Sequence, residues 1–247
     1  MSFDHPVLGL HDRAMPTLED AERTHELYPR WGSIAPLPNA RMMLHVGAES
    51  VENFLVVGDA WGQLVASQLE GPSRILDIGC GCGRTARTLL QNPWVTEYFG
   101  FDVVPVYPAW CNRWLSPLAR GKFSFLHVDV HSERYNPQGR YRGSEVEFPY
   151  ATGSLDLAFA ASLFTHLFEA DARRYLAEAA RVVRPGGKLI ASFHDRPSSG
   201  VYSGDEHRAD VAPDYFEGMA RASGWGGVGA ELDDVCGQRV LVLVRQA

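Results

Sequence analysis

Apolar and polar positions along the chain follow two periods, which together predict strands alternating with helices. Short apolar runs have the length and β-branched content of buried strands, and the stretches between them place apolar side chains at helical spacing. This alternation indicates a doubly wound α/β fold with a largely parallel sheet. We expect strands at 75–78, 96–104, 122–130, 154–162, 188–193, 228–232 and 239–245, and helices at 51–69, 84–90, 106–118, 168–183 and 214–223.

Residues 1–50 lack this periodicity and contain several prolines, so we expect an irregular N-terminal extension or lid before a single domain over 51–247. Two later segments also lack it. Residues 131–153 carry no regular pattern, and residues 196–213 are polar with glycine and serine. We interpret the second segment as a mobile loop that contributes to a ligand site.

The stretch RILDIGCGCGRTARTLL, residues 74–90, joins a predicted strand to a predicted helix through three glycines at alternate positions. Gly79, Gly81 and Gly83 allow positive φ and the close approach of a ligand to the backbone. A helix that begins at Arg84 would present unpaired N–H groups at its N-terminus. These groups suit the polar or anionic part of a nucleotide-like ligand.

The glycine spacing separates two ligand classes. The dinucleotide fingerprint is G-x-G-x-x-G/A, which fails here because the glycines run G-x-G-x-G and position 84 is Arg. The stretch resembles the first motif of the class I S-adenosylmethionine-dependent methyltransferases, D-x-G-x-G-x-G, with Asp77 as its acid. From residue 51 onward the resemblance implies a Rossmann-like sheet of seven strands, mostly parallel, with the last strand antiparallel. It also implies S-adenosylmethionine as cofactor and an extension that folds over it; the alternative for the extension is a packing arm or a homodimer contact.

Two further strand ends supply candidate cofactor contacts. Asp102 ends the second strand about 20 residues past the glycines, where a carboxylate can accept the ribose hydroxyls, with Val103 beside it. The alternative is that Asp102 caps the helix that begins near Pro105. The resemblance further implies that Asp129 and the backbone of Val130 bind the adenine; the alternative is a cap or turn role for Asp129.

The loops after the fourth and fifth strands hold the candidate acceptor site. The resemblance implies that Ser162, Leu163 and Phe164 line the methionine part of the cofactor and the acceptor channel. His166 can take a proton from an acceptor hydroxyl, since histidine ordinarily titrates near working pH, and His194 is the competing base. The alternative is that Thr165 and His166 simply cap the next helix.

Composition argues against nucleic acid, a membrane and a metal ion as partners of the protein. A formal net charge of −7 argues against a nucleic-acid surface, no apolar run has membrane-spanning length, and we expect a cytoplasmic location. The four cysteines lack metal-site spacing, so no metal is expected. The sequence thus predicts methyl transfer to an oxygen or nitrogen of a small-molecule acceptor, such as a secondary metabolite, yielding S-adenosylhomocysteine. The alternative is a catalytically idle S-adenosylmethionine-binding partner with a regulatory or structural role.

Overall fold

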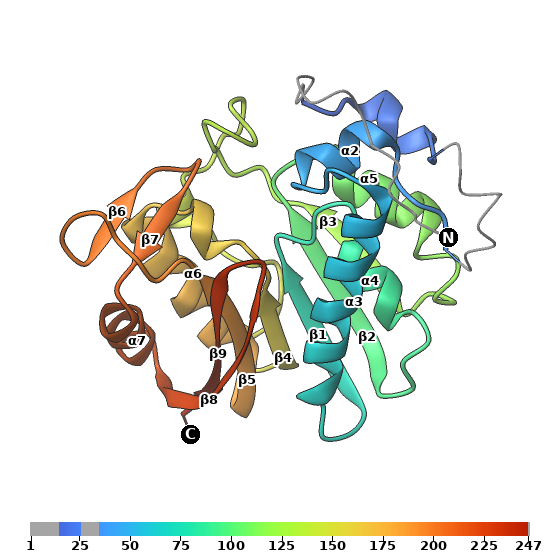
Figure 1. Cartoon of the computed structure of the whole chain (residues 1–247). Coiled ribbons are helices and arrows are strands. Elements are labelled where there is room, and N and C mark those ends of the chain that lie inside the picture. The colour runs from blue at the N-terminus through green and yellow to red at the C-terminus, as the bar shows by residue number, and fades with distance from the viewer. Residues whose placement is uncertain (1–14, 26–34, 247) are drawn as a thin grey trace. The chain divides into compact units, whose positions relative to one another are not determined.

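The computed structural model describes residues 15–25 and 35–246, and its chain forms two compact units (Figure 1). The first unit contains residues 1–68 and 80–128, and the second contains residues 69–79 and 129–247. The chain passes from one unit to the other inside the glycine turn, between Gly79 and Cys80. The domain boundary predicted at residue 50 stays a prediction.

The first unit contains two parallel strands and a set of helices. Strand β2 pairs with β3 in a register that runs from Tyr98 opposite Phe123 to Asp102 opposite His127. This register places the carboxyl ends of both strands side by side. The elements are η1 (Leu18–Glu22), α2 (Ala40–His45), α3 (Val51–Ser67), α4 (Arg84–Leu89), β2 (Val95–Asp102), α5 (Val106–Trp114) and β3 (Phe123–His127).

The N-terminal segment is more regular than the sequence pattern predicted. Helix α2 begins at an Asn39 cap, whose side chain accepts from the Met42 amide at 3.1 Å. The indole nitrogens of Trp110 and Trp114 in α5 each donate, at 2.9 Å, to carbonyls of the segment around η1. The described part of the expected irregular extension thus contains two short helices, which capping and long-range packing hold without a strong local period.

The second unit contains five strands of the main sheet in the order β1, β4, β5, β9, β8. Strands β1, β4 and β5 are parallel, and β9 is antiparallel to both of its neighbours. Its elements are β1 (Ser73–Ile78), η2 (Gly143–Glu145), β4 (Leu155–Ala160), η3 (Phe164–His166), α6 (Glu169–Val182), β5 (Val183–Phe193), β6 (Tyr202–Gly204), β7 (Ala209–Val211), α7 (Pro213–Ala222), β8 (Trp225–Val235) and β9 (Gln238–Arg245).

Together with β2 and β3 these strands make the expected seven-stranded, mostly parallel α/β sheet, and the expected antiparallel last strand is confirmed. Two local expectations are wrong. Strand β5 begins at Val183 and not at residue 188, because Val183 already pairs with Leu155 of β4, ahead of the register shift before Leu157. The segment 196–213 contains the β6–β7 hairpin (Figure 1), whose short strands pair with each other.

Packing of the second unit rests on aromatic side chains. The rings of Phe193 and Phe216 stack at a centroid distance of 4.2 Å, and Phe164 meets Phe216 edge to face at 5.1 Å. The Trp225 indole donates to the Leu176 carbonyl at 3.0 Å, which fixes α6 to β8. Across the described residues, no helix combines the length and the apolar character that crossing a membrane requires.

Candidate active site

The expected left-handed turn is present at all three glycines. Gly79, Gly81 and Gly83 have φ of +77°, +52° and +75°. The N–H groups of this turn, however, are largely used within the chain: Cys80 donates to the Phe101 carbonyl at 2.9 Å and Gly83 to the Cys80 carbonyl at 3.1 Å. The Gly81 amide donates to the Asp102 carboxylate at 2.8 Å. These three amides are used because the turn folds onto the end of β2. The expectation that the first amides of α4 (Arg84–Leu89) meet a ligand stays a prediction.

Each glycine of the turn also lies against a packed side chain. A Cβ on Gly81 would lie 3.3 Å from Val46, a Cβ on Gly83 would lie 2.9 Å from the Cys111 sulfur, and a Cβ on Gly79 would lie 3.2 Å from Leu163. The glycine pattern therefore serves packing as well as close approach of a ligand. Val46 directly follows α2, so the N-terminal segment reaches the turn within the first unit; its role as a lid over a cofactor stays a prediction.

Asp102 is a buried carboxylate of the first unit, and both of its oxygens accept hydrogen bonds. It is buried at the end of β2, and besides Gly81 it accepts from the Val104 amide at 2.8 Å through its other carboxylate oxygen. Helix α5 has Pro105 as its N-cap residue, with no side-chain cap, so Asp102 is not its cap and that alternative is wrong. Each carboxylate oxygen has two lone pairs. The carboxylate therefore keeps acceptor capacity for ribose hydroxyls while it holds the turn.

Burial raises the pKa of Asp102 to about 6, although the backbone amides of Val104 and Gly81 oppose this shift. The residue thus ionises close to neutral pH, where a small change of its surroundings alters its charge. Beside it, Val103 is half-buried, and its carbonyl accepts from Nε2 of His127 at 3.1 Å. His127 is an exposed neighbour that the sequence pattern did not single out; the strand register opposite Asp102 is the signal that identifies it.

The two residues predicted to meet the adenine lie beyond β3, which ends at His127. The Asp129 carboxylate pairs with Nε of Arg140 at 2.6 Å, and this hydrogen bond holds the pKa of Asp129 below its usual value. Val130 is buried and bridges to Tyr141. In this structure both residues order the 129–141 loop of the second unit, and their contact with adenine stays a prediction.

The turn after β4 is held by a buried hydrogen-bond network. Ser162 has a left-handed φ of +59°, which costs a non-glycine residue about 1 kcal/mol or more. Its amide donates to the Ser192 hydroxyl at 2.8 Å, that hydroxyl donates to the Gln238 amide oxygen at 2.8 Å, and the Gln238 amide nitrogen donates back to the Ser162 hydroxyl at 2.9 Å. The network closes a ring across β4, β5 and β9 and stabilises the strained turn.

The hydrogen-bonded turn at Ser162 sets the directions of the two side chains that follow it in the chain. Leu163 is half-buried and lies beside Gly79, whereas the Phe164 ring points into the aromatic core and is only 2% exposed. Sequence reasoning placed Ser162, Leu163 and Phe164 together on the cofactor. Within the second unit, Ser162 and Leu163 remain candidates for that surface, and the Phe164 side chain serves the core. Sequence reasoning missed Ser192 and Gln238, since neither has a motif.

His166 lies in η3 beside the β6–β7 hairpin. Its Nδ1 is 3.0 Å from the Glu206 carbonyl, and Nη1 of Arg134 is 3.5 Å away. Because a carbonyl can only accept, we assign the proton to Nδ1, which leaves the Nε2 lone pair able to accept a proton. Helix α6 has Phe168 as its N-cap residue without a side-chain cap, so the alternative that Thr165 and His166 cap this helix is wrong.

Burial, and next the positive charge of Arg134, lower the pKa of His166 to about 4. The expectation that this imidazole titrates near working pH is therefore wrong. His166 is neutral across the physiological range, so it can accept a proton at any such pH, but it is a weak base. Its side chain is further enclosed by the edge of the Tyr135 ring, at a centroid distance of 5.5 Å.

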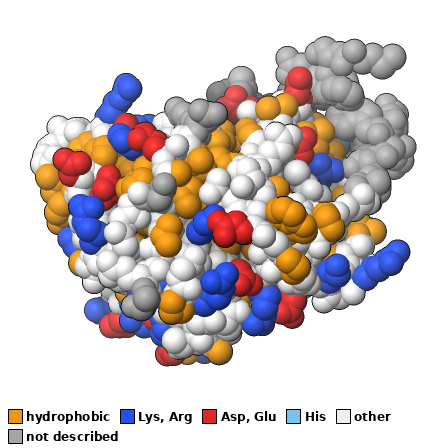
Figure 2. Space-filling view, turned by 90° about the horizontal axis from the view of Figure 1, so that it is seen from below, with side chains coloured by type: hydrophobic (Ala, Val, Ile, Leu, Met, Phe, Trp, Pro, Cys, Tyr) orange, Lys and Arg blue, Asp and Glu red, His pale blue; other side chains and the backbone are white. Residues whose placement is uncertain are grey.

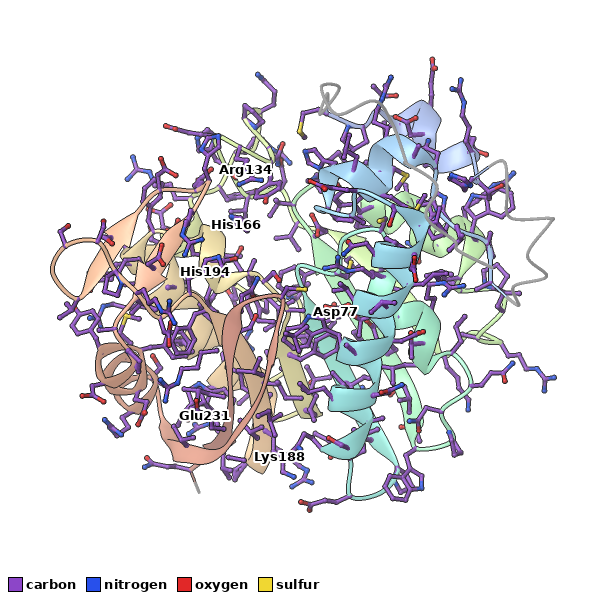
Figure 3. All side chains as sticks on the ribbon, viewed as in Figure 1. Asp77, Arg134, His166, Lys188, His194 and Glu231 are labelled. Carbon is purple, nitrogen blue, oxygen red and sulfur yellow. The ribbon has the colours of Figure 1, made fainter. Side chains whose placement is uncertain are left out.

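His194 follows β5 directly and is half-buried, and its carbonyl accepts from the Val211 amide at 2.8 Å. Figure 3 shows Arg134, His166 and His194 at one end of the second unit, while Lys188 and Glu231 lie at the other. Lys188 at that far end pairs with Glu70 at 2.7 Å. Seen from that side, acidic and basic side chains lie next to one another (Figure 2). The candidate residues His166 and His194 therefore lie with Arg134 toward the carboxyl ends of the strands of this unit, where ligands of α/β sheets bind.

Comparison with known proteins identifies the class: residues 76–191 match the family described as "Methyltransferase domain". This match, over just under half of the chain, confirms the resemblance to class I S-adenosylmethionine-dependent methyltransferases for these residues. The match contains most of the predicted site residues, from Asp77 to His166.

The chain is also similar to two curated proteins. The chain is 29% identical over 150 residues to demethylmenaquinone methyltransferase of Deinococcus radiodurans, which covers 60% of this chain and 55% of that protein. It is 24% identical over 187 residues to probable tocopherol O-methyltransferase of Oryza sativa subsp. japonica. This match covers 74% of this chain and 45% of that protein. The chain thus spans about half the length of these curated relatives.

The structure of 1,6-didemethyltoxoflavin-N1-methyltransferase of Burkholderia thailandensis superposes with a TM-score of 0.56 at 16% identity, covering 78% of this chain and 80% of that one. At this identity the similarity shows the fold.

Proposed function

We propose that this protein transfers a methyl group from S-adenosylmethionine to an oxygen or nitrogen of a small-molecule acceptor. S-adenosylhomocysteine is the second product. The observation that supports this most is Asp102, a buried carboxylate that ends β2 and at the same time holds the Gly81 amide of the glycine turn. That arrangement matches the position at which the matched class carries its ribose-binding acid.

The residues of the turn fit such a nucleoside. Side chains are excluded at Gly79 and Gly81 by positive φ, which leaves the backbone accessible to a ligand. Asp102 and Val103 would hold the ribose side, and Asp129 and Val130 are the candidates for the adenine. Ser162 and Leu163 would meet the methionine part. Asp77 and the three glycines match the family motif, and the other assignments are what the resemblance to the family implies.

Methyl transfer from S-adenosylmethionine requires few catalytic groups from the protein. Bound S-adenosylmethionine supplies a methyl group that its sulfonium already activates. The chain needs to hold the acceptor atom in line with that methyl group, exclude water and receive a proton where the acceptor carries one. We infer that His166 receives it at Nε2, because the contact with the Glu206 carbonyl assigns the imidazole proton to Nδ1. His194 is the second candidate.

The names of the relatives guide the choice of acceptors. Those names include a tocopherol O-methyltransferase and an N1-methyltransferase of a didemethyltoxoflavin, so they cover both an oxygen and a nitrogen. A first panel should therefore contain phenols, quinols and ring nitrogen compounds of these kinds.

Two measurements test the proposal. Titration calorimetry should show binding of S-adenosylmethionine and none of NAD, and incubation with the acceptor panel should release S-adenosylhomocysteine above the rate without acceptor. Tight binding with no turnover on any acceptor would favour the idle binding partner instead. Binding of NAD but not of S-adenosylmethionine would overturn the proposal.

A further inference from the structure

Arg134 forms no salt bridge within the described part of the chain. Its positive charge acts only weakly on the exposed carboxylate of Asp205, whose pKa is lowered mainly by the backbone amides of His207 and Arg208. Its Nη1 donates to the carbonyls of His207 at 2.8 Å and Glu206 at 3.4 Å, and carbonyls have no net charge. The other arginine that packs on a tyrosine of the same loop, Arg140, pairs with Asp129 at 2.6 Å. Arg134 is thus half-buried, held in place and still cationic.

The fold holds Arg134 at this position with several contacts. The Glu206 carboxylate, which is buried, accepts from the Arg134 amide at 2.9 Å and from the Ser132 hydroxyl at 2.7 Å. The Arg134 guanidinium lies over the Tyr135 ring at 4.9 Å. The carboxylate that could have neutralised the guanidinium is therefore bound to the backbone and to a hydroxyl instead.

The neighbour of this cation is the candidate base. Nη1 of Arg134 lies 3.5 Å from Nδ1 of His166, and His194 lies at the same end of the unit (Figure 3). A permanent cation and a neutral imidazole with a free lone pair thus occur side by side. Such a pair suits a ligand group that can both give up a proton and carry the resulting negative charge.

We propose that Arg134 binds the acceptor as an oxygen anion, so that the substrates are oxygen acids such as phenols, enols or carboxylic acids. This inference rests on the proposed function. The acceptor's O–H bond breaks and its proton passes to Nε2 of His166 or to water. A lone pair of the oxygen then forms the new O–CH₃ bond while the methyl–sulfur bond breaks with its electron pair left on sulfur. The products are a methyl ether or ester and S-adenosylhomocysteine.

The pKa values of the base and of the possible acceptors favour a phenol or another oxygen acid over an alcohol as the acceptor. A base whose pKa is about 4 is about six pKa units too weak to deprotonate a phenol of pKa about 10, and still weaker against an alcohol with a pKa near that of water, about 15.7. An adjacent cation lowers the pKa of an acid by about 1 to 3 units. A phenol beside Arg134 is then partly ionised at neutral pH, whereas an alcohol is not.

The test uses coloured phenols, above all 4-nitrophenol, whose anion absorbs visible light. Each phenol is titrated with the full-length protein in the presence of S-adenosylhomocysteine, so that no turnover occurs. We expect the bound phenol to ionise about 1 to 3 pH units below the free compound. Arg134→Gln should bind the phenolate at least about tenfold more weakly, and Arg134→Lys should restore part of the binding. Arg142→Gln removes the same charge from an exposed site of the loop and is the matched control.

The outcomes separate this inference from the proposed function. Binding of the cofactor together with no phenolate binding by any phenol overturns the inference and leaves the proposed function standing. Equal phenolate binding by the wild-type protein and Arg134→Gln also overturns it. Failure of the wild-type protein to bind S-adenosylmethionine in the parallel calorimetric titration overturns both.

Discussion

Replacing Asp102 by Asn changes the charge of one buried group while keeping its size. In the wild-type protein one carboxylate oxygen accepts from Gly81 and the other from Val104, both at 2.8 Å. Asn retains one of these acceptors and places an NH₂ group against the other N–H. We expect Asp102→Asn to remain folded and to lose most of its affinity for the cofactor.

Two effects of Asp102→Asn on the free energy of unfolding, the loss of a buried charge and the loss of a hydrogen bond, largely offset each other. Burial raises the carboxyl pKa from 3.8 to about 6, so the folded state takes up its proton at a higher pH than the unfolded state does. Ionisation therefore destabilises the fold as the pH rises between these values, by about 3 kcal/mol once the pH is above 6. The Asn variant avoids this cost but leaves an N–H donor facing an NH₂, which costs about 1 to 3 kcal/mol. The net change in the free energy of unfolding should be small.

The effect of Asp102→Asn on the affinity for the cofactor has no such compensation. Hydrogen bonds from ribose hydroxyls to a carboxylate are each worth about 1.5 to 3 kcal/mol, and the neutral Asn oxygen replaces only part of them. A net loss of about 2 to 4 kcal/mol corresponds to a dissociation constant about 30- to 700-fold higher. Below about pH 6 the wild-type affinity should also fall towards that of the variant, because Asp102 becomes protonated, whereas the affinity of the variant should not depend on this ionisation.

Calorimetric titration of S-adenosylhomocysteine from about pH 5 to about pH 8 measures both effects, with urea unfolding of both proteins as the check on folding. Dissociation constants of wild type and Asp102→Asn that agree within twofold near neutral pH would refute the ribose assignment. A wild-type affinity that parallels that of the variant at every pH would refute the role of the raised pKa.

Further expectations concern other parts of the site. Gly81→Val should abolish cofactor binding in calorimetry, because a β-branched residue opposes φ of +52° and its Cβ would crowd Val46; normal binding by a folded variant would count against the turn. His166→Gln should lower turnover about 100-fold with cofactor affinity unchanged, and the wild-type rate should show no loss from His166 protonation until the pH approaches 4. Because the folded-state pKa of His166 lies below its unfolded value of 6.5, wild type should lose up to about 3 kcal/mol more stability than His166→Gln as the pH falls from 6.5 to 4, as measured by urea unfolding. Gln238→Leu should lower the free energy of unfolding by about 1 to 3 kcal/mol, since it leaves the Ser162 hydroxyl without its buried donor; an unchanged urea midpoint would contradict this.

Local patterns predicted much of the fold because each strand and helix of the sheet carries its own period. The strand that ends at Asp102 and the left-handed glycines were predicted because β-strand length and glycine spacing are local properties. The β6–β7 hairpin was not, because each of its strands has only three residues and no period can be recognised in so short a segment. Helix α2 was missed for the same reason.

The site was predicted less completely because its energetics depend on distant partners. Ser162 is held by Gln238, 76 residues further along the chain, and no local signal joins them. The low pKa of His166 follows from burial and from Arg134, which comes from a loop with no regular pattern. The use of the Gly81 amide by Asp102 is likewise a tertiary contact. Motif reasoning therefore supplied the candidate residues, whose roles stay predictions, whereas their hydrogen bonds and pKa values depend on tertiary packing.

The most direct test is transfer of a deuterated methyl group. The protein is incubated with S-adenosylmethionine that carries a CD₃ group and with the panel of phenols, quinols and nitrogen compounds, and the products are analysed by mass spectrometry. We expect one acceptor to gain CD₃ in place of a hydrogen, with one molecule of S-adenosylhomocysteine formed for each product and far less product from the Asp102→Asn variant. Formation of no labelled product by wild-type protein saturated with S-adenosylmethionine, across the whole panel, would contradict the proposed methyl transfer.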